Sequence, residues 1–349
     1  MQDLLRGQEI YLFFYRFGTK GILGIIICNI IMAYIIYKTL KITYTKNINS
    51  YKEFLDNIFS NNLKLSKITN VIINIFLCAT FFIMIAGFGT YLSQSLKINQ
   101  IIGSVILAII SYIVFLKNIE SFAKINSVII PILIIIILII GTKNLLNLPQ
   151  IGNNIITDKS QYGWILQATL YASYNLILVE PSIINLKKFL KSKKQIIKIS
   201  IILGIIMTIL SVMEFLLLAN VDINFQNLEM PLVYVIENKF NKFKLLYGII
   251  ILIAIFTTAV SVGLGFLNNI CKNEKSFPQI ALILCISSVL ISPIGFSNLI
   301  NNLFPLFGFL GLIQITYIFV KKWQKKVKIL LFLYQFDKIK TNKIKRSLT

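Results

Sequence analysis

The sequence contains no histidine among its 349 residues. This absence excludes Ser–His and Cys–His catalysis and removes the commonest protein ligand of zinc. The four cysteines have none of the CxxC spacing of metal or redox motifs; they are Cys28, Cys78, Cys271 and Cys285. Isolated cysteines of this kind are typical of small buried residues. No nucleophile–base pair or metal-ligand cluster is visible either, so we do not expect an enzyme.

Charged residues are scarce, at 14% of the chain, against about 25% in soluble domains. Hydrophobic residues make up 56%, and the mean hydropathy is +0.79. The apolar residues form long runs, such as 128–140 and 245–259. A helix needs about 20 apolar residues to cross roughly 30 Å of hydrocarbon. The composition therefore predicts an all-α polytopic membrane protein, and the N-terminus has no signal-peptide pattern.

Nine apolar stretches are long enough to cross a bilayer, and a short amphipathic piece, 10–17, precedes them. The predicted spans are 20–38, 68–94, 99–116, 122–142, 163–186, 199–219, 245–268, 277–292 and 296–320. Two of the connections have structure of their own. In residues 51–59, apolar and charged residues alternate at helical spacing, which favours a short helix on the cytoplasmic surface. Residues 227–240 suit an extracellular helix that could cap a pathway. A solvated connection is an equal alternative for both.

Acidic residues are few, 13 against 35 basic ones, which gives a net charge of +22. No basic–aromatic module accompanies this charge, so we expect no nucleic-acid partner. The lysines instead cluster in alternate connections, with six in residues 38–67 and six in 187–198. Positive loops of this kind mark the cytoplasmic side. The pattern predicts a multi-pass protein of a cytoplasmic membrane, with the lipid bilayer as its partner and a basic cytoplasmic tail, 321–349.

The span 163–186 is the most interrupted one. Its middle is polar, and Pro181 follows, which removes a backbone donor. Secondary transporters often contain inverted repeats whose first helices are broken at a midplane solute site. A kinked structural helix is the alternative. The polar residues that we predict to bind a small-molecule solute are Tyr171, Ser173, Tyr174 and Asn175.

The short segment near the N-terminus matches this interruption, because Gly7 and Gln8 precede only half a helix. The repeats would be 1–146 and 163–320, joined by an extracellular connection, 147–162. Gly87 and Tyr91, in the span 68–94, are further candidates for the solute site.

Hydroxyl groups in the span 245–268 favour an ion site. Thr257, Thr258 and Ser261 share a helix face and could ligate sodium together with backbone oxygens. Close helix packing by small residues is an equal alternative. Charged residues inside spans are usually functional, and Glu180 is our candidate for a protonatable or cation-binding group. The role of Glu214, in the span 199–219, stays open. Sodium is the one candidate cofactor.

With these residues in view, the chain resembles the YkvI family of uncharacterised bacterial membrane proteins, over nearly its whole length. The resemblance lies in GQEI at 7–10, RFG at 16–18, SYKEF at 50–54, AGFGTYLS at 86–93, LYASYN at 170–175 and TTAVS at 257–261. That family is grouped with the amino acid–polyamine–cation permeases. The resemblance implies a LeuT-like five-plus-five inverted repeat of about ten helices, with the first one incomplete here. It also implies that residues 171–175 are unwound and that Thr258 and Ser261 face a sodium ion.

The sequence departs from the family before GQEI, where relatives carry a glycine-rich apolar stretch and this chain has MQDLLR. Carbonyl groups of that stretch would complete the sodium site. We expect either a start codon further upstream or an N-terminally truncated, inactive product.

The leading functional hypothesis is a secondary transporter of an amino acid or similar small organic solute, working by alternating access. Coupling would be to sodium through Thr258 and Ser261, or to protons through Glu180. The alternative is a receptor-like protein of the same fold that senses a germinant or nutrient without transport, a hypothesis that rests on analogy.

Overall fold

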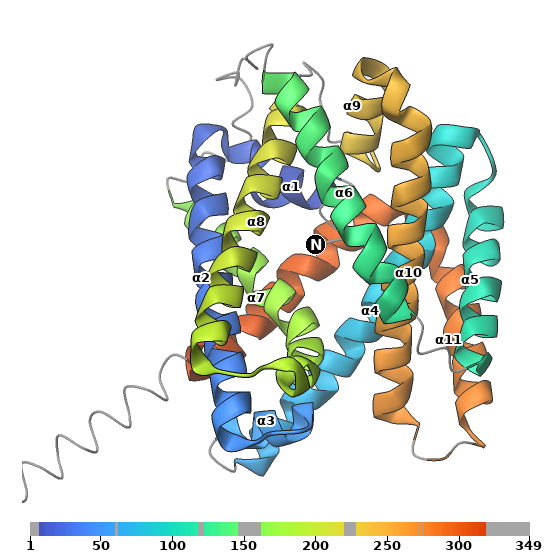
Figure 1. Cartoon of the computed structure of the whole chain (residues 1–349). Coiled ribbons are helices and arrows are strands. Elements are labelled where there is room, and N and C mark those ends of the chain that lie inside the picture. Colours follow the sequence, from blue (N-terminus) through green and yellow to red (C-terminus); the bar gives the residue numbers. More distant parts are fainter. Residues whose placement is uncertain are drawn as a thin grey trace, which may run out of the picture.

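The computed structural model describes residues 7–59, 62–117, 122–145, 162–219, 228–271, 273 and 275–318. Within these ranges every regular element is a helix (Figure 1). The α-helices are α1 (Gln8–Phe13), α2 (Thr19–Lys46), α3 (Tyr51–Ile58), α4 (Leu63–Leu96), α5 (Gln100–Lys117), α6 (Phe122–Leu145), α7 (Gly163–Asn185), α8 (Lys193–Ala219), α9 (Pro231–Lys239), α10 (Lys244–Ile270) and α11 (Phe277–Ile291). A further helix, Phe296–Ile318, follows and is called helix 296–318 below. Short 3-10 turns include η2 (Tyr15–Phe17), η4 (Leu186–Phe189) and η7 (Ser292–Ile294).

Each of the nine predicted spans is occupied by a helix whose ends lie within a few residues of the prediction, except that α2 and α8 are longer by one to two turns. Seven helices in the described residues are long and apolar enough to cross a membrane: Thr19–Lys46, Leu63–Leu96, Gln100–Lys117, Lys193–Ala219, Asn241–Ile270, Phe277–Ile294 and Phe296–Ile318. The protein is therefore a polytopic helical membrane protein. Most of the predicted connection 147–162 and the whole tail 321–349 lie outside the described residues.

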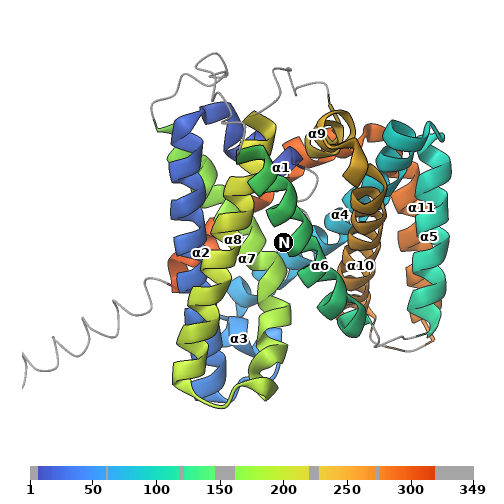
Figure 2. The same ribbon diagram turned by 45° about the horizontal axis from the view of Figure 1, so that its top comes forward.

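The helices form two groups. In one, α2 packs against both α7 and α8; in the other, α4 packs against α5, α10 and α11. The groups stand side by side in Figures 1 and 2, and α6 lies between them, in contact with α8 and α10. The two ends of the molecule are marked by short helices, α3 at one and α9 at the other (Figure 1). The bundle thus has an α3 end and an α9 end.

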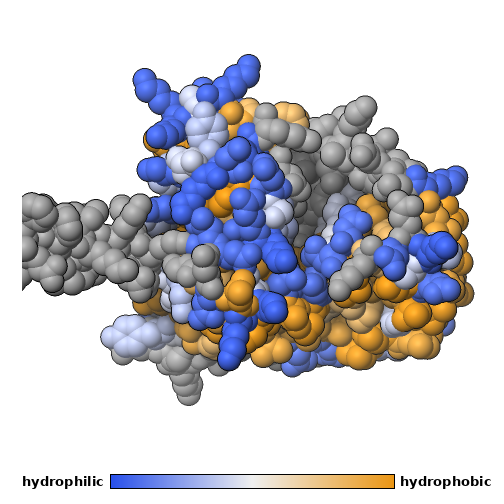
Figure 3. Space-filling model, turned by 90° about the horizontal axis from the view of Figure 1, so that it is seen from below, coloured by the Kyte–Doolittle hydropathy of each residue, from blue (hydrophilic) through white to orange (hydrophobic). Residues whose placement is uncertain are grey.

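The helix α5 shows how the apolar residues divide between lipid and core. Its exposed large hydrophobic side chains recur at helical spacing, and they are Ile101, Ile102, Val105, Ile106, Ile109, Ile110, Ile113 and Leu116. The opposite face carries small residues and packs closely on α4. A Cβ atom on Gly89 would lie 2.3 Å from the carbonyl oxygen of Gln100. Seen from the α3 end, hydrophilic residues gather on the end face and hydrophobic ones lie along the flank (Figure 3). Bulky residues therefore face the lipid, and small ones let the helices approach.

The helix α4 is the longest element, with 34 residues, and is about 51 Å long at 1.5 Å per residue. It runs obliquely through the bundle in Figure 1. Its N-cap is Asn62, whose side chain accepts a hydrogen bond from the N–H of Leu65.

The helix predicted within residues 51–59 is confirmed as α3. Ser50 caps its N-terminus by accepting the N–H of Glu53, and the Glu53 carboxylate accepts the N–H of Asn49 at 3.0 Å. This reciprocal arrangement is a capping box. Phe54, Leu55 and Ile58 are buried beneath α3, so the helix is fixed to the bundle end.

The expectation that residues 171–175 are unwound is wrong. The helix α7 is continuous from Gly163 to Asn185, with Pro181 inside it. The polar side chains bond to its own carbonyl groups instead: Ser173 donates to Thr169 at 2.6 Å, and Asn175 donates to Tyr171 at 3.0 Å. Because each polar group finds a partner one turn back, no break in the helix is needed to satisfy it.

Candidate functional site

The short helix α1 lies inside the bundle near the α9 end. Gly7 precedes it with φ +74°, and a Cβ atom there would lie 2.7 Å from the Cβ of Leu232 in α9. Gly18, with φ +58°, then turns the chain into α2. A Cβ atom on Gly21 would meet the carbonyl oxygen of Phe14 at 2.1 Å. Glycine is required at these positions by positive φ or by close approach, and this holds α1 between α2 and α9.

Three buried aromatic residues pack on the ring of Tyr174, whose hydroxyl contacts Glu9, and we call this group the central cluster: Glu9, Phe13, Tyr171, Tyr174 and Phe304. The Tyr174 hydroxyl donates a hydrogen bond to Oε2 of Glu9. The centroid of the Tyr174 ring lies 5.4 Å from the ring centroid of Phe13, 5.3 Å from that of Tyr171 and 4.7 Å from that of Phe304. All five side chains are at most 1% exposed. The sequence-predicted tyrosines of α7 are thus brought onto α1 and helix 296–318.

A second buried carboxyl, Glu214 of α8, lies close to the central cluster. It is 0% exposed, and neither of its oxygens accepts a hydrogen bond from a described residue. Its charge interacts with that of Glu9, and α8 packs directly on α1. Two interacting carboxyl groups inside a membrane bundle are costly unless a cation or protons neutralise them.

One hydrogen-bond network lies on the α9 side of the cluster, and we call it the α9-end network: Gln8, Glu229, Ser297 and Asn301. The Gln8 amide donates to Ser297 Oγ at 2.7 Å and to Asn301 Oδ1 at 3.1 Å. The backbone N–H of Ser297 donates to Glu229 Oε2 at 2.6 Å. These bonds connect α1, helix 296–318 and the segment that enters α9.

Another network lies at the opposite end of α7, and we call it the α3-end network: Thr39, Tyr51, Glu180 and Gln314. Thr39 Oγ1 donates to Glu180 Oε1 at 3.2 Å, and the Tyr51 hydroxyl donates to Oε2 at 3.5 Å. The Gln314 amide also donates to Oε2. Glu180 is 1% exposed. The network joins α2, α3, α7 and helix 296–318 through one carboxyl.

The remaining predicted solute-site residues pack against other helices, and their role in solute binding stays a prediction. Ser173 and Asn175 are buried within α7, and a Cβ atom on Gly311 would lie 2.8 Å from the Ser173 carbonyl oxygen. Gly87 faces the ring of Phe296, and the Tyr91 hydroxyl lies directly against Gly248 of α10. These two α4 residues pack helices together outside the central cluster.

The predicted ion-binding hydroxyls bond along their own helix. Thr257 and Thr258 both donate to the carbonyl of Ala254, at 3.2 and 2.8 Å, and Ser261 donates to the carbonyl of Thr257 at 2.7 Å. Thr257 is buried, whereas Ser261 is exposed. The hydroxyl oxygens keep lone pairs for an ion, so sodium binding there stays a prediction.

Sequence reasoning missed several residues of these networks: Thr39, Tyr51, Glu229, Ser297, Asn301 and Gln314. Glu9 was visible in the GQEI motif but had no assigned role. The signal that would have identified Glu9 is its position, because it is an acidic residue in the half-helix next to the predicted solute site.

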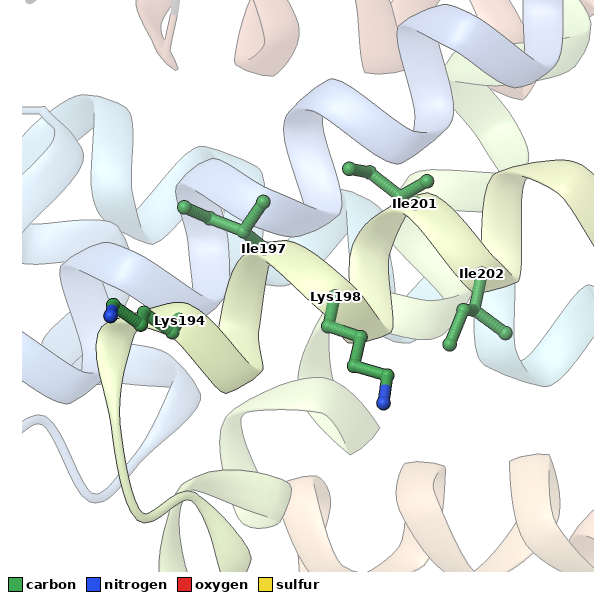
Figure 4. A pocket seen from close by; sticks show the side chains of 5 residues that line it. All are labelled: Lys194, Ile197, Lys198, Ile201 and Ile202. Carbon is green, nitrogen blue, oxygen red and sulfur yellow. The ribbon is translucent and has the colours of Figure 1, made fainter.

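A shallow groove lies on the outer face of α8 (Figure 4). It is lined by Lys194, Ile197, Lys198, Ile201 and Ile202. All five residues are exposed. Isoleucines with lysines at one end suit lipid chains and headgroups, so this groove belongs to the lipid-facing surface.

Comparison with known proteins supports a YkvI-like membrane protein. The chain is 27% identical over 321 residues to the uncharacterized membrane protein YkvI of Bacillus subtilis (strain 168), covering 90% of each chain. It is 28% identical over 326 residues to the uncharacterized protein YyaD of the same organism, covering 91% of this chain and 93% of that protein. No known protein-family model matches the chain.

Proposed function

We propose that this protein is a secondary transporter of an amino acid or similar small organic solute that carries an ammonium group. The observation that carries the proposal is the Glu9–Tyr174 hydrogen bond within the central cluster, beside the buried Glu214. Ionisable residues at membrane depth usually mark substrate pathways. The cluster lies between two networks that join helices at opposite ends of the bundle, as alternating access requires.

The chemistry of the cluster favours an organic ammonium over other solutes. Once deprotonated, Glu9 and Glu214 would supply negative charge, and an ammonium would neutralise it through charge-assisted hydrogen bonds. The rings of Tyr171, Tyr174 and Phe13 offer cation–π contacts and apolar surface to the rest of the solute. A metal ion would instead prefer a larger set of oxygen ligands.

The two helix groups provide the moving parts. We propose a LeuT-like inverted repeat in which the group α2, α7 and α8 rocks against the group α4, α5, α10 and α11, around the central cluster. The α3 end faces the cytoplasm in this proposal, because the lysine-rich connections 38–67 and 187–198 lie there. Sodium at Thr258 and Ser261 is a coupling candidate, and a proton at Glu180 is another.

Ligand-dependent melting of the purified protein tests the site. A solute at about a hundred times its dissociation constant should stabilise the fold by about 2.7 kcal/mol. We expect an amino acid or alkylamine to raise the melting temperature of the wild type and of Glu53→Gln, a surface control in α3. Glu9→Gln should abolish the shift. An unchanged shift in Glu9→Gln would contradict the assignment of the site.

Uptake of the stabilising solute into proteoliposomes then tests transport. We expect accumulation that Glu9→Gln abolishes and Glu53→Gln retains. Specific binding with no uptake under any ion gradient would refute the transporter and favour a sensing protein.

A further inference from the structure

The partners of Glu180 are all neutral groups that can both donate and accept hydrogen bonds. Thr39 and Tyr51 contribute hydroxyls, and Gln314 contributes an amide. An ionised Glu180 accepts from all three. A protonated Glu180 has one O–H to donate, and a turned Gln314 amide or either hydroxyl oxygen can accept it. The network can therefore satisfy both protonation states of this one buried carboxyl.

Among the described residues, no lysine or arginine hydrogen-bonds Glu180, so none of these cations holds it ionised. The described charged side chains of the elements packed around it have other partners or face solvent. Those with partners are Lys38 with Tyr34, Lys41 with Tyr37, Lys46 with Asn57, Lys187 with Asn47 and Asn49, Glu53 with the N–H of Asn49, and Asp56 with Ser66. Lys20 and Lys52 are exposed. Two further phenols nearby are also engaged: Tyr44 donates to the Lys191 carbonyl, and Tyr317 packs on Phe59. The described part of helix 296–318 contains no charged residue.

Tyr51 is the other titratable group of the network. Burial raises the pKa of its phenol well above the ordinary value, and the charge of Glu180 raises it further. Tyr51 therefore stays protonated at physiological pH, and Glu180 is the group that exchanges a proton.

We propose that Glu180 is the proton-binding site that couples solute movement to protons, an inference that rests on the proposed transport function. Burial disfavours the charged carboxylate, so Glu180 holds a proton while the α3-end network is closed. When α2, α3 and helix 296–318 separate, water reaches the carboxyl and the O–H proton passes to solvent, leaving the carboxylate. Opening of the α3 end and proton release are one step.

The sign of the pH effect follows from this step. The closed state binds one more proton than the open state, so raising the pH favours opening, by up to about tenfold per pH unit. Lowering the pH keeps the α3 end closed.

Hydrogen–deuterium exchange of the α3 backbone tests the proposal without any solute. After correction for intrinsic exchange, we expect α3 in the wild type to exchange faster as the pH rises. Glu180→Gln, a neutral isostere, should make exchange independent of pH. Glu53→Gln should follow the pH response of the wild type, because a glutamine at this position of the capping box can still accept the N–H of Asn49. A pH response in Glu180→Gln equal to that of the wild type would overturn the proposal.

Tyr51→Phe provides a second variant that keeps the titrating carboxyl. It removes one hydroxyl partner, so the pH response should persist with a shifted midpoint, and an unshifted midpoint would contradict the network. In proteoliposomes, a pH gradient should drive accumulation by the wild type but not by Glu180→Gln. Because the exchange measurement needs no transport, a pH-responsive α3 without flux refutes only the proposed function. Flux with a pH-independent α3 refutes only the role of Glu180.

Discussion

Replacement of Gly311 by alanine tests how tightly helix 296–318 holds α7 beside the central cluster. A Cβ atom on Gly311 would lie 2.8 Å from the Ser173 carbonyl oxygen and 2.8 Å from Cδ1 of Ile177. The oxygen belongs to the backbone of a continuous helix, so it cannot turn aside as a flexible side chain can. The two helices must therefore move apart to admit the methyl group.

The size of the effect follows from two opposing terms. Two non-bonded heavy atoms reach ordinary van der Waals contact at about 3.5 Å, so the two helices must separate by about 0.7 Å. A gap of this size loses about a quarter to a half of the van der Waals attraction at each of the other contacts between the helices. Overpacking of this kind costs about 1–3 kcal/mol, while alanine is favoured over glycine in a helix by about 1 kcal/mol. Gly265→Ala, in α10, is the matched control, because its Cβ would lie 3.6 Å from Leu77 Cδ1, at ordinary contact distance.

The difference between the two variants cancels the helix-propensity term. Gly311→Ala should be less stable than Gly265→Ala by about 1–3 kcal/mol, which corresponds to roughly 2–6 °C in melting temperature at about 2 °C per kcal/mol. Both variants would be melted in the same detergent at one scan rate, because membrane-protein unfolding is often irreversible. If Gly311→Ala melts at or above Gly265→Ala, the close contact between helix 296–318 and α7 is refuted.

Three further predictions concern the elements around the site. Gly7→Ala should destabilise the protein by about 2–4 kcal/mol, since it combines a left-handed backbone with a collision against Leu232; a melting temperature equal to that of the wild type would contradict this. Ser50→Ala should cost about 1 kcal/mol through loss of the α3 cap, and faster backbone exchange confined to α3 would confirm it. Tyr174→Phe should lower stability by about 1–3 kcal/mol, because the buried Glu9 loses the hydroxyl that donates a hydrogen bond to it; an unchanged melting temperature would show that the bond contributes nothing.

The helices were predictable because lipid imposes a simple rule on sequence. A run of apolar residues long enough to cross the bilayer forms a helix, since each backbone group must be satisfied within the segment. The surface helix α3 was also readable, because its capping box and its apolar spacing are local signals. The sequence likewise placed Gln8 and Tyr174 in one site, and the structure brings Glu9, next to Gln8, onto Tyr174.

The networks were not predictable because their partners are far apart in sequence. Gln8 and Ser297 are separated by 289 positions, and Gln314 and Glu180 by 134. A glutamine or serine in an apolar stretch has no pattern that names its partner. The expected break in α7 failed for a local reason, since Ser173 and Asn175 close on carbonyls one turn back. Polarity in a span indicates a need for partners, and it does not reveal whether they are supplied by the same helix or by another.

The length of α4 makes the thickness of the bilayer a variable of this protein. At about 51 Å, the helix exceeds roughly 30 Å of hydrocarbon by a wide margin, so it must lean or extend into the headgroup regions. A thicker bilayer would favour a more upright α4, and a thinner one a greater tilt. Since α5, α10 and α11 all pack along α4, a change of its tilt would be shared by that whole helix group. Lipid chain length thus acts directly on the framework against which the helices around Glu9 and Glu180 are held.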